Sequence, residues 1–250
     1  MSAAHRVLNP NECDSTAADL CALAVMTKAP CPGQVKTRLT PPLTSEEAAA
    51  LNICFLRDTA AAISQVRVGA RGIGCYTPLG SEDAYRESLP ANFQLIPQRG
   101  DSLGERLILA TEDLLQIGFN SVCLINSDSP TVPPRIFSEA VTALVAPNDT
   151  VVLGPSEDGG YYLIGLKKAH RRMFEKIEWS TERVFDQTVA RAAELKLEVH
   201  FLPTWYDVDD RATLDRLCEE LLGPNEPAVN CAAPATREFL SRIFATLPSR

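Results

Sequence analysis

Residues 20–64 read LCALAVMTKAPCPGQVKTRLTPPLTSEEAAALNICFLRDTAAAIS, and this stretch decides the fold class. The apolar run Leu20–Met26 stops at Lys28-Ala-Pro, which predicts a short, fully buried strand. Thr44 and Glu47 have the spacing of a capping box ahead of Ala, Leu and Ile at helical intervals, which predicts a helix. A buried strand, a loop and a long helix in this order indicate an α/β protein.

The same alternation continues along the chain. Further strands are predicted at Gly72–Tyr76, Phe93–Ile96, Val122–Asn126, Thr150–Leu153, Tyr161–Leu166 and Leu197–Leu202. Further helices are predicted at Glu82–Ser88, Leu103–Ile117, Pro134–Val145, Glu182–Leu195, Arg211–Leu222 and Thr236–Phe244. Strands that alternate with helices favour parallel pairing, so we expect a three-layer α/β domain with helices on both faces of a mostly parallel sheet.

The length of 250 residues suits one globular domain. We expect this domain at residues 19–222, after a polar, disordered leader at 1–18. A Pro/Asn-rich loop and a last helix at 223–250 are expected to pack on the domain.

The charge argues against nucleic acid as a partner. The chain has 24 Lys+Arg and 32 Asp+Glu, a net charge of −8. Binding of a phosphate backbone or of an anionic membrane needs a basic surface. Any bound phosphate must therefore be held by a local cluster of basic residues.

Compartment and redox state follow from two further observations. The first 20 residues have no signal-peptide core, and no apolar run approaches the ~18 residues of a membrane span, so we expect a cytoplasmic protein. Eight cysteines without a CxxC motif or paired Cys/His spacing are expected to be buried, reduced thiols.

The loop after the first strand contains such a cluster of basic residues. The 26 residues 20–45 contain no Asp or Glu, although the average composition predicts about three, and they include Lys28, Lys36 and Arg38. Loops that leave the carboxyl ends of strands face the ligand crevice of an open α/β sheet. Gly33 would let the backbone approach a phosphate, Lys36 would add a point charge and Arg38 a bidentate fork. A solvated surface loop is the alternative.

An acidic residue follows the strand Val122–Asn126. Asp128 would face the same crevice, where Mg²⁺ takes one or two carboxylates and completes its shell with phosphate and water. The alternative is an Asx-turn or a helix cap at Asp128 or Ser129.

Two further acidic segments follow later strands. In Glu157-Asp158-Gly159-Gly160, an acid could act as a base or bind sugar hydroxyls beside glycines that admit close approach, but an Asp-Gly hairpin turn explains the same residues. In YDVDD, Asp207 and Asp209 could share one face, whereas Asp210 is a natural helix N-cap.

Six motifs, KAPCPGQVKTRL, QRGDSLGERL, NSDSP, GPSEDGGYYLIGL, EWST and DVDD, span about residues 20–220. On these motifs the chain resembles a bacterial family with the Rossmann-like GT-A (nucleotide-diphospho-sugar transferase) fold, the radical-SAM/selenodomain-associated (arsenosugar-biosynthesis-type) glycosyltransferases. KTRL also looks like a loop of phospholactate guanylyltransferase, and DVDD looks like the end of 3-deoxy-octulosonate cytidylyltransferases. Asp210 stands where those cytidylyltransferases usually have Thr, which leaves open whether Asp207 or Asp209 binds metal.

The resemblance implies a Mg²⁺- or Mn²⁺-dependent transferase. It implies metal ligands at Asp128 and Asp209, and catalytic roles for Lys36, Arg38 and Asp158. Nucleotide or phosphate contacts are implied at Lys28, Gly33, Lys36, Arg38, Gln98, Gly104 and Arg106. Acceptor or sugar contacts are implied at Asp158, Gly159, Gly160, Tyr161 and Trp179.

We therefore expect glycosyl transfer from a nucleotide sugar to a small-molecule acceptor, without nucleic acid or membrane as a partner, and with a homodimer as one option. The first alternative is a nucleotidyltransferase that releases pyrophosphate from an NTP and a phosphorylated acceptor. The second is a non-catalytic nucleotide-binding regulator, because a fold does not fix a function.

Overall fold

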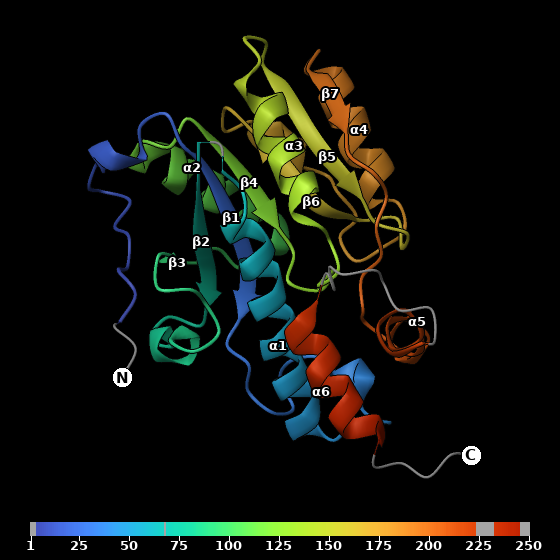
Figure 1. Cartoon of the computed structure of the whole chain (residues 1–250). Coiled ribbons are helices and arrows are strands. Elements are labelled where there is room, and N and C mark those ends of the chain that lie inside the picture. Colours follow the sequence, from blue (N-terminus) through green and yellow to red (C-terminus); the bar gives the residue numbers. More distant parts are fainter. Residues whose placement is uncertain (1–3, 68, 224–232, 246–250) are drawn as a thin grey trace.

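A seven-stranded sheet of order β3-β2-β1-β4-β6-β5-β7 forms the centre of the molecule (Figure 1). The computed structural model describes residues 4–67, 69–223 and 233–245. The strands are β1 Cys21–Lys28, β2 Ala70–Thr77, β3 Gln94–Pro97, β4 Ser121–Ile125, β5 Thr150–Pro155, β6 Tyr161–Leu166 and β7 Glu198–Phe201. Every predicted strand is present within two residues at each end. The spacing of apolar residues and the turn-forming residues between the runs therefore located the strands correctly.

Six α-helices accompany the sheet in the described residues. They are α1 Ser45–Ser64, α2 Leu103–Ile117, α3 Pro134–Val145, α4 Val184–Glu194, α5 Arg211–Leu222 and α6 Pro234–Ala245. The capping box predicted at Thr44 and Glu47 is present at the start of α1. The short helix predicted at Glu82–Ser88 is only a 3₁₀ turn over Glu82–Tyr85.

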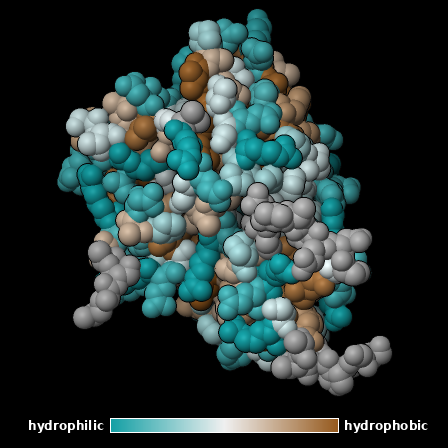
Figure 2. Space-filling view, viewed as in Figure 1, coloured by the Kyte–Doolittle hydropathy of each residue, from teal (hydrophilic) through white to brown (hydrophobic). Residues whose placement is uncertain are grey.

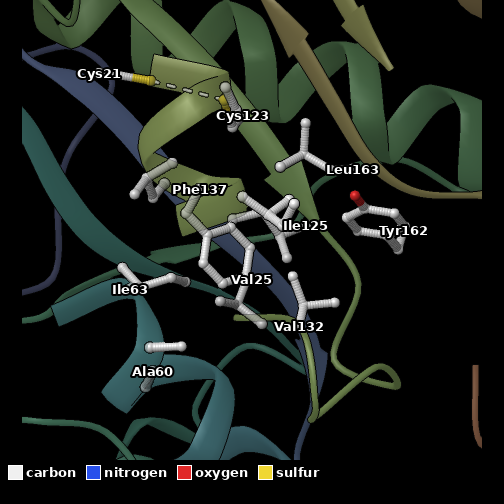
Figure 3. Close-up of a cluster of buried hydrophobic side chains, with 14 of the residues drawn as sticks. Cys21, Val25, Ala60, Ile63, Cys123, Ile125, Val132, Phe137, Tyr162 and Leu163 are labelled. Atoms are coloured by element: carbon white, nitrogen blue, oxygen red, sulfur yellow. Dashed lines mark hydrogen bonds between the residues drawn. The ribbon is translucent and has the colours of Figure 1, made fainter. Parts of the chain in front are cut away.

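Helices cover both faces of the sheet, which confirms the three-layer α/β architecture. Val25 of β1 packs on one face with Ile63 of α1 and Phe137 of α3, as Figure 3 shows. Ala24 faces the other side and packs in the cluster that contains Leu114 of α2 and part of α4. Successive strand residues thus serve opposite cores, because side chains alternate along a strand.

One strand departs from parallel pairing. β1, β2, β3 and β4 are parallel neighbours, and β5 and β7 are parallel, but β6 is antiparallel to both β4 and β5. Only the turn 156–160 separates β5 from β6. A connection this short cannot carry a parallel crossover, so β6 must run back beside β5.

The prediction of a disordered leader at 1–18 is wrong for residues 4–18. The imidazole of His5 is buried and lies within hydrogen-bond distance of the Phe93 and Tyr85 carbonyls. The Leu8 amide donates to the Leu95 carbonyl, beside the bridge that Val7 forms with β3. This segment is polar in sequence but covers the otherwise unpaired edge of β3.

The last helix, α6, packs against α1 and α5. Phe239 and Leu240 of α6 are buried in a third core with residues of α1 and α5. The Asp58 carboxylate of α1 accepts hydrogen bonds from the Ala235 and Thr236 amides and so caps α6 from a neighbouring helix. Residues 224–232 of the predicted loop lie outside the described residues.

The thiol prediction is confirmed only in part. None of the seven described cysteines forms a disulfide. Cys21 and Cys123 lie in the core with their sulfur atoms 3.8 Å apart (Figure 3). Cys13 and Cys31 are exposed rather than buried.

One face of the molecule shows how polar and apolar residues are distributed on the surface. The face in Figure 2 is mostly hydrophilic, with apolar residues scattered between polar ones. Among the described residues, no helix is both long and apolar enough to cross a membrane.

Candidate active site

Two adjoining cavities open at the carboxyl ends of the central strands, where an open α/β sheet binds ligands. One has a volume of about 390 Å³ and the other of about 500 Å³. Both are lined by the same five residues at their boundary, Met26, Arg38, Leu103, Asp128 and Asp209. We treat them as two halves of one cleft.

The two halves carry opposite charge. The smaller cavity, here the basic hollow, is lined by the cations Lys28, Lys36, Arg38 and Arg106 and the acids Asp128 and Asp209. The larger cavity, here the acidic hollow, is lined by the acids Asp128, Asp158, Glu182, Asp207 and Asp209 and the cation Arg38. The boundary residues Asp128 and Asp209 belong to both hollows.

Lys36 lies at this boundary and joins the two acids. Its Nζ is 2.6 Å from Asp128 Oδ1 and 2.9 Å from Asp209 Oδ1, and it donates to the Val208 carbonyl at 2.8 Å. Only 5% of the side chain is exposed. Burial by itself lowers the pKa of Lys36, but the negative charges of Asp128 and Asp209 raise it overall, so the ammonium stays charged.

The loop holds Lys36 in place by a local turn. Lys36 has a left-handed backbone, with φ of +48°, and it begins the 3₁₀ turn Thr37–Leu39. Leu39 is fully buried and packs in the core formed by α1, α5 and α6. The Phe55 ring of α1 lies 5.4 Å from Lys36 Nζ, a cation–π contact. A buried leucine thus anchors the loop and fixes the lysine between the acids.

Asp207 differs from its neighbour Asp209 in environment. Its Oδ1 accepts a 2.7 Å hydrogen bond from Asn126 Nδ2 and a short one from the Ser129 hydroxyl. Burial is the main reason that the pKa of Asp207 rises to about 6, and the charges of Asp128 and Asp158 raise it further. The sequence did not predict that Asn126 and Ser129 bond to Asp207. These residues are 81 and 78 positions from Asp207, and only the folded sheet brings them together.

Asp210 is the helix cap that the sequence predicted. Its carboxylate accepts from the Thr213 amide at 2.9 Å, at the start of α5. Arg38 Nη2 lies 3.7 Å from the other Asp210 oxygen, and the Arg38 side chain is 70% exposed. Arg38 is therefore held loosely and can turn toward a ligand in either hollow.

The segment Asp158-Gly159-Gly160 forms a hairpin turn between β5 and β6. Asp158 Oδ1 accepts from the Gly160 amide at 2.9 Å. Gly159 has a φ of +85°, and a Cβ there would lie 2.1 Å from the Glu182 carbonyl. Glycine is thus required at position 159 because the Glu182 backbone approaches it closely. Asp158, in contrast, is exposed and lines the acidic hollow.

The predicted acceptor residues mostly gather in the acidic hollow. Gly160, Tyr161 and Trp179 line it beside Asp158, but Gly159 does not. The Trp179 indole packs on Gly104, where a Cβ would lie 2.8 Å from Nε1. Gly104 therefore supports the indole rather than lining either hollow.

The predicted nucleotide residues are only partly brought together. Lys28, Gln98 and Arg106 line the basic hollow with Lys36 and Arg38, but Gly33 does not. Gln98 Nε2 donates to the Thr27 and Cys75 carbonyls, so its amide also ties β1 to β2. Glu182 lines the acidic hollow and was missed as a site residue, because the sequence placed it inside a helix that begins only at Val184.

Comparisons with known proteins bear on the family and on the fold. Residues 59–181 match the family described as "Uncharacterized protein conserved in bacteria (DUF2064)". A crystal structure from Desulfovibrio desulfuricans G20, described as a putative nucleotide-diphospho-sugar transferase, is 30% identical and superposes with a TM-score of 0.79. The match covers 91% of this chain and 96% of that chain. This chain belongs to the DUF2064 family.

Two cytidylyltransferases share the fold of this DUF2064 protein. CMP:2-keto-3-deoxy-manno-octonic acid synthetase complexed with CTP is 10% identical, over 79% of this chain and 96% of that one, with a TM-score of 0.50. A cytidylyltransferase from Leptospira borgpetersenii serovar Hardjo-bovis is 9% identical, over 91% and 94% of the two chains, with a TM-score of 0.51. No curated protein matches the sequence. The transferase fold that the motifs predicted is confirmed.

Proposed function

We propose that this DUF2064 protein is a Mg²⁺-dependent transferase that binds the diphosphate of a nucleotide in the basic hollow. The favoured reaction is glycosyl transfer from a nucleotide sugar to a small-molecule acceptor. The observation that carries the proposal is the polarised cleft, in which the basic hollow meets the acidic one at Lys36, Asp128 and Asp209. The protein is acidic overall, yet four cations line the basic hollow, where a diphosphate would bind.

The acids at the boundary fit a magnesium ion in donor type. No group of three or more His, Cys, Asp or Glu that could hold a metal is present in the described residues. Mg²⁺ needs only one or two carboxylates when phosphate oxygens and water complete its shell. Asp128 and Asp209 remain 34% and 43% exposed beside Lys36, so both can reach a ligand in the cleft. When bound, the ion would neutralise charge that develops on the diphosphate.

The chain's own residues have separate tasks in glycosyl transfer. Arg38 binds phosphate oxygens through its guanidinium fork, and the buried charge of Lys36 attracts the same oxygens. Asp158 accepts the proton of the acceptor hydroxyl on the oxygen that the Gly160 amide does not occupy. The acceptor oxygen then bonds to the sugar carbon, and the bond from that carbon to the diphosphate breaks.

Nucleotidyl transfer is the second candidate. It is favoured by the two cytidylyltransferases that share the fold. The cations of the basic hollow would then stabilise leaving pyrophosphate instead of a nucleoside diphosphate. A non-catalytic nucleotide-binding regulator would show binding without either product.

A thermal-shift panel followed by product analysis tests the proposal. Nucleotide sugars and NTPs are compared with and without Mg²⁺, since a ligand at 100 times its Kd stabilises a protein by ~2.7 kcal/mol. We expect a Mg²⁺-dependent shift with a nucleotide sugar, and release of a nucleoside diphosphate when an acceptor is present. Pyrophosphate release from an NTP would reverse the order of the two reactions, and no shift with any nucleotide would contradict the proposal.

A further inference from the structure

We infer that the acidic hollow takes an uncharged, hydroxyl-rich group and rejects groups that carry a phosphate or a carboxylate. This inference rests on the proposed function and names the substrate class for the second half of the same cleft. It comes from the charges and walls of the acidic hollow, not from any feature of the basic one.

Three of the acids in the acidic hollow have no cationic partner. Asp128 and Asp209 share the charge of Lys36. Asp158, Glu182 and Asp207 form no ion pair with any residue that the structure describes, although Asp207 accepts hydrogen bonds from Asn126 and Ser129. Among the described residues that line this hollow, Arg38 is the one cation against five acids. A phosphate or carboxylate there would therefore face an excess of like charge, which weakens binding.

The same three acids favour hydroxyl groups. An ionised carboxylate only accepts hydrogen bonds, so it complements a ligand rich in donors. Both hydrogen bonds to the Asp207 side chain end on Oδ1, which leaves Oδ2 for the hollow that the residue lines. Sugar and polyol hydroxyls meet this requirement without adding negative charge.

Apolar and aromatic side chains complete the wall of the hollow. Leu107, Tyr161 and Trp179 line the hollow together with the acids. Aromatic rings bury large apolar surfaces at low cost in conformational freedom, and they pack against the C–H face of a sugar ring. A volume of about 500 Å³ lies within the range of small-ligand sites.

Quenching of Trp179 fluorescence reads the charge of the hollow directly. Trp205→Phe leaves Trp179 as the sole tryptophan, because the chain has two. Relative to free tryptophan, caesium should quench Trp179 better than iodide does, and Glu182→Gln should raise iodide quenching about twofold. The matched control Glu87→Gln removes one exposed acid that lines neither hollow and should leave quenching unchanged. If Trp205→Phe does not fold, the difference between the native protein and Trp179→Phe gives the same signal.

A pair of ligands then tests selectivity by calorimetry in Mg²⁺. UDP-glucose and UDP-glucuronate differ only by the carboxylate on the sugar. We expect the Kd of UDP-glucuronate to exceed that of UDP-glucose by on the order of tenfold. Glu182→Gln should reduce this difference in Kd, because it removes one negative charge from the hollow. Equal or tighter binding of UDP-glucuronate, or equal quenching by iodide and caesium, would overturn the inference. If neither sugar nucleotide nor any nucleotide of the panel binds, the proposed function fails as well, and the quenching result still separates the two failures.

Discussion

The Lys36 ammonium donates to two carboxylates and a carbonyl, all from loops that follow other strands. The sequence predicted a phosphate role for Lys36 and a metal role for Asp128 and Asp209, each from its own loop. It could not predict that the three groups touch, because Lys36 and Asp209 are 173 positions apart. Their contact means that a Mg²⁺ ion bound as proposed would share the carboxylates of Lys36, so the two proposed roles would be coupled.

Replacement of the lysine tests this coupling. Lys36→Met should destabilise the metal-free protein by about 1–2 kcal/mol, because the partly exposed Asp128 and Asp209 lose the cation between them and the Val208 carbonyl loses its donor. Mg²⁺ should then raise Tm more in the variant than in the native protein. Thermal unfolding at increasing Mg²⁺ measures both effects. Lys28→Met, which removes an exposed cation of the basic hollow, is the control, and the same Mg²⁺ response in all three proteins would contradict the coupling.

Arg38 should bind phosphate through its geometry as well as its charge. The ion pair of Arg38 Nη2 with Asp210 Oδ2, at 3.7 Å, lies at the surface and adds at most about 1 kcal/mol to stability, so substitutions should leave the fold intact. We expect Arg38→Ala to weaken nucleotide binding by about tenfold or more. Arg38→Lys should restore only part of the affinity, since an ammonium group cannot bind two phosphate oxygens as the planar guanidinium does. Calorimetry measures both. Arg86→Ala, outside both hollows, is the control. Unchanged affinity in Arg38→Ala would mean that this loop is only solvated surface.

At the scale of elements, local signals were enough to place most helices. α2, α3 and α5 begin and end where the sequence predicted, because caps, a leading proline and a terminal glycine act within a few residues. The antiparallel direction of β6 and the pairing of residues 7–8 with β3 were not predicted. Both depend on which sheet edge is available, and that is a property of the assembled fold.

The turn before β6 offers a matched pair of glycines. Gly159 and Gly33 both have a positive φ, +85° and +73°, but only Gly159 has backbone within 4 Å of its missing Cβ. Each alanine substitution should cost about 1–2 kcal/mol in backbone strain. Gly159→Ala should cost more than Gly33→Ala and change Trp179 fluorescence, since the Glu182 backbone must shift. Denaturant unfolding and emission spectra measure this, and equal costs with unchanged emission would show that the turn and the 179–182 segment are not coupled.

At the scale of the whole molecule, the chain separates its charge along one cleft. The sequence predicted that acids and cations gather at the carboxyl ends of the strands, since chain order and fold class determine which loops lie there. It did not predict that cations line one hollow and unpaired acids the other, because this separation depends on how the segments that follow β1, β3, β4, β5, β6 and β7 pack together. Under the proposed function, this separation of charge would give the cleft a direction, with the diphosphate in the basic hollow and the uncharged group in the acidic hollow.

The central claim is that Asp128 and Asp209 jointly support metal-dependent binding of a nucleotide diphosphate. Nucleotide titrations of the native protein, Asp128→Asn, Asp209→Asn and the double variant, with and without Mg²⁺, test it most directly. Asparagine keeps an oxygen acceptor for Lys36, so the fold should survive. We predict that either change removes the Mg²⁺-dependent part of binding and that the double variant loses little more, because both acids act through one ion. Fully additive losses, or a native affinity that does not depend on Mg²⁺, would contradict the account.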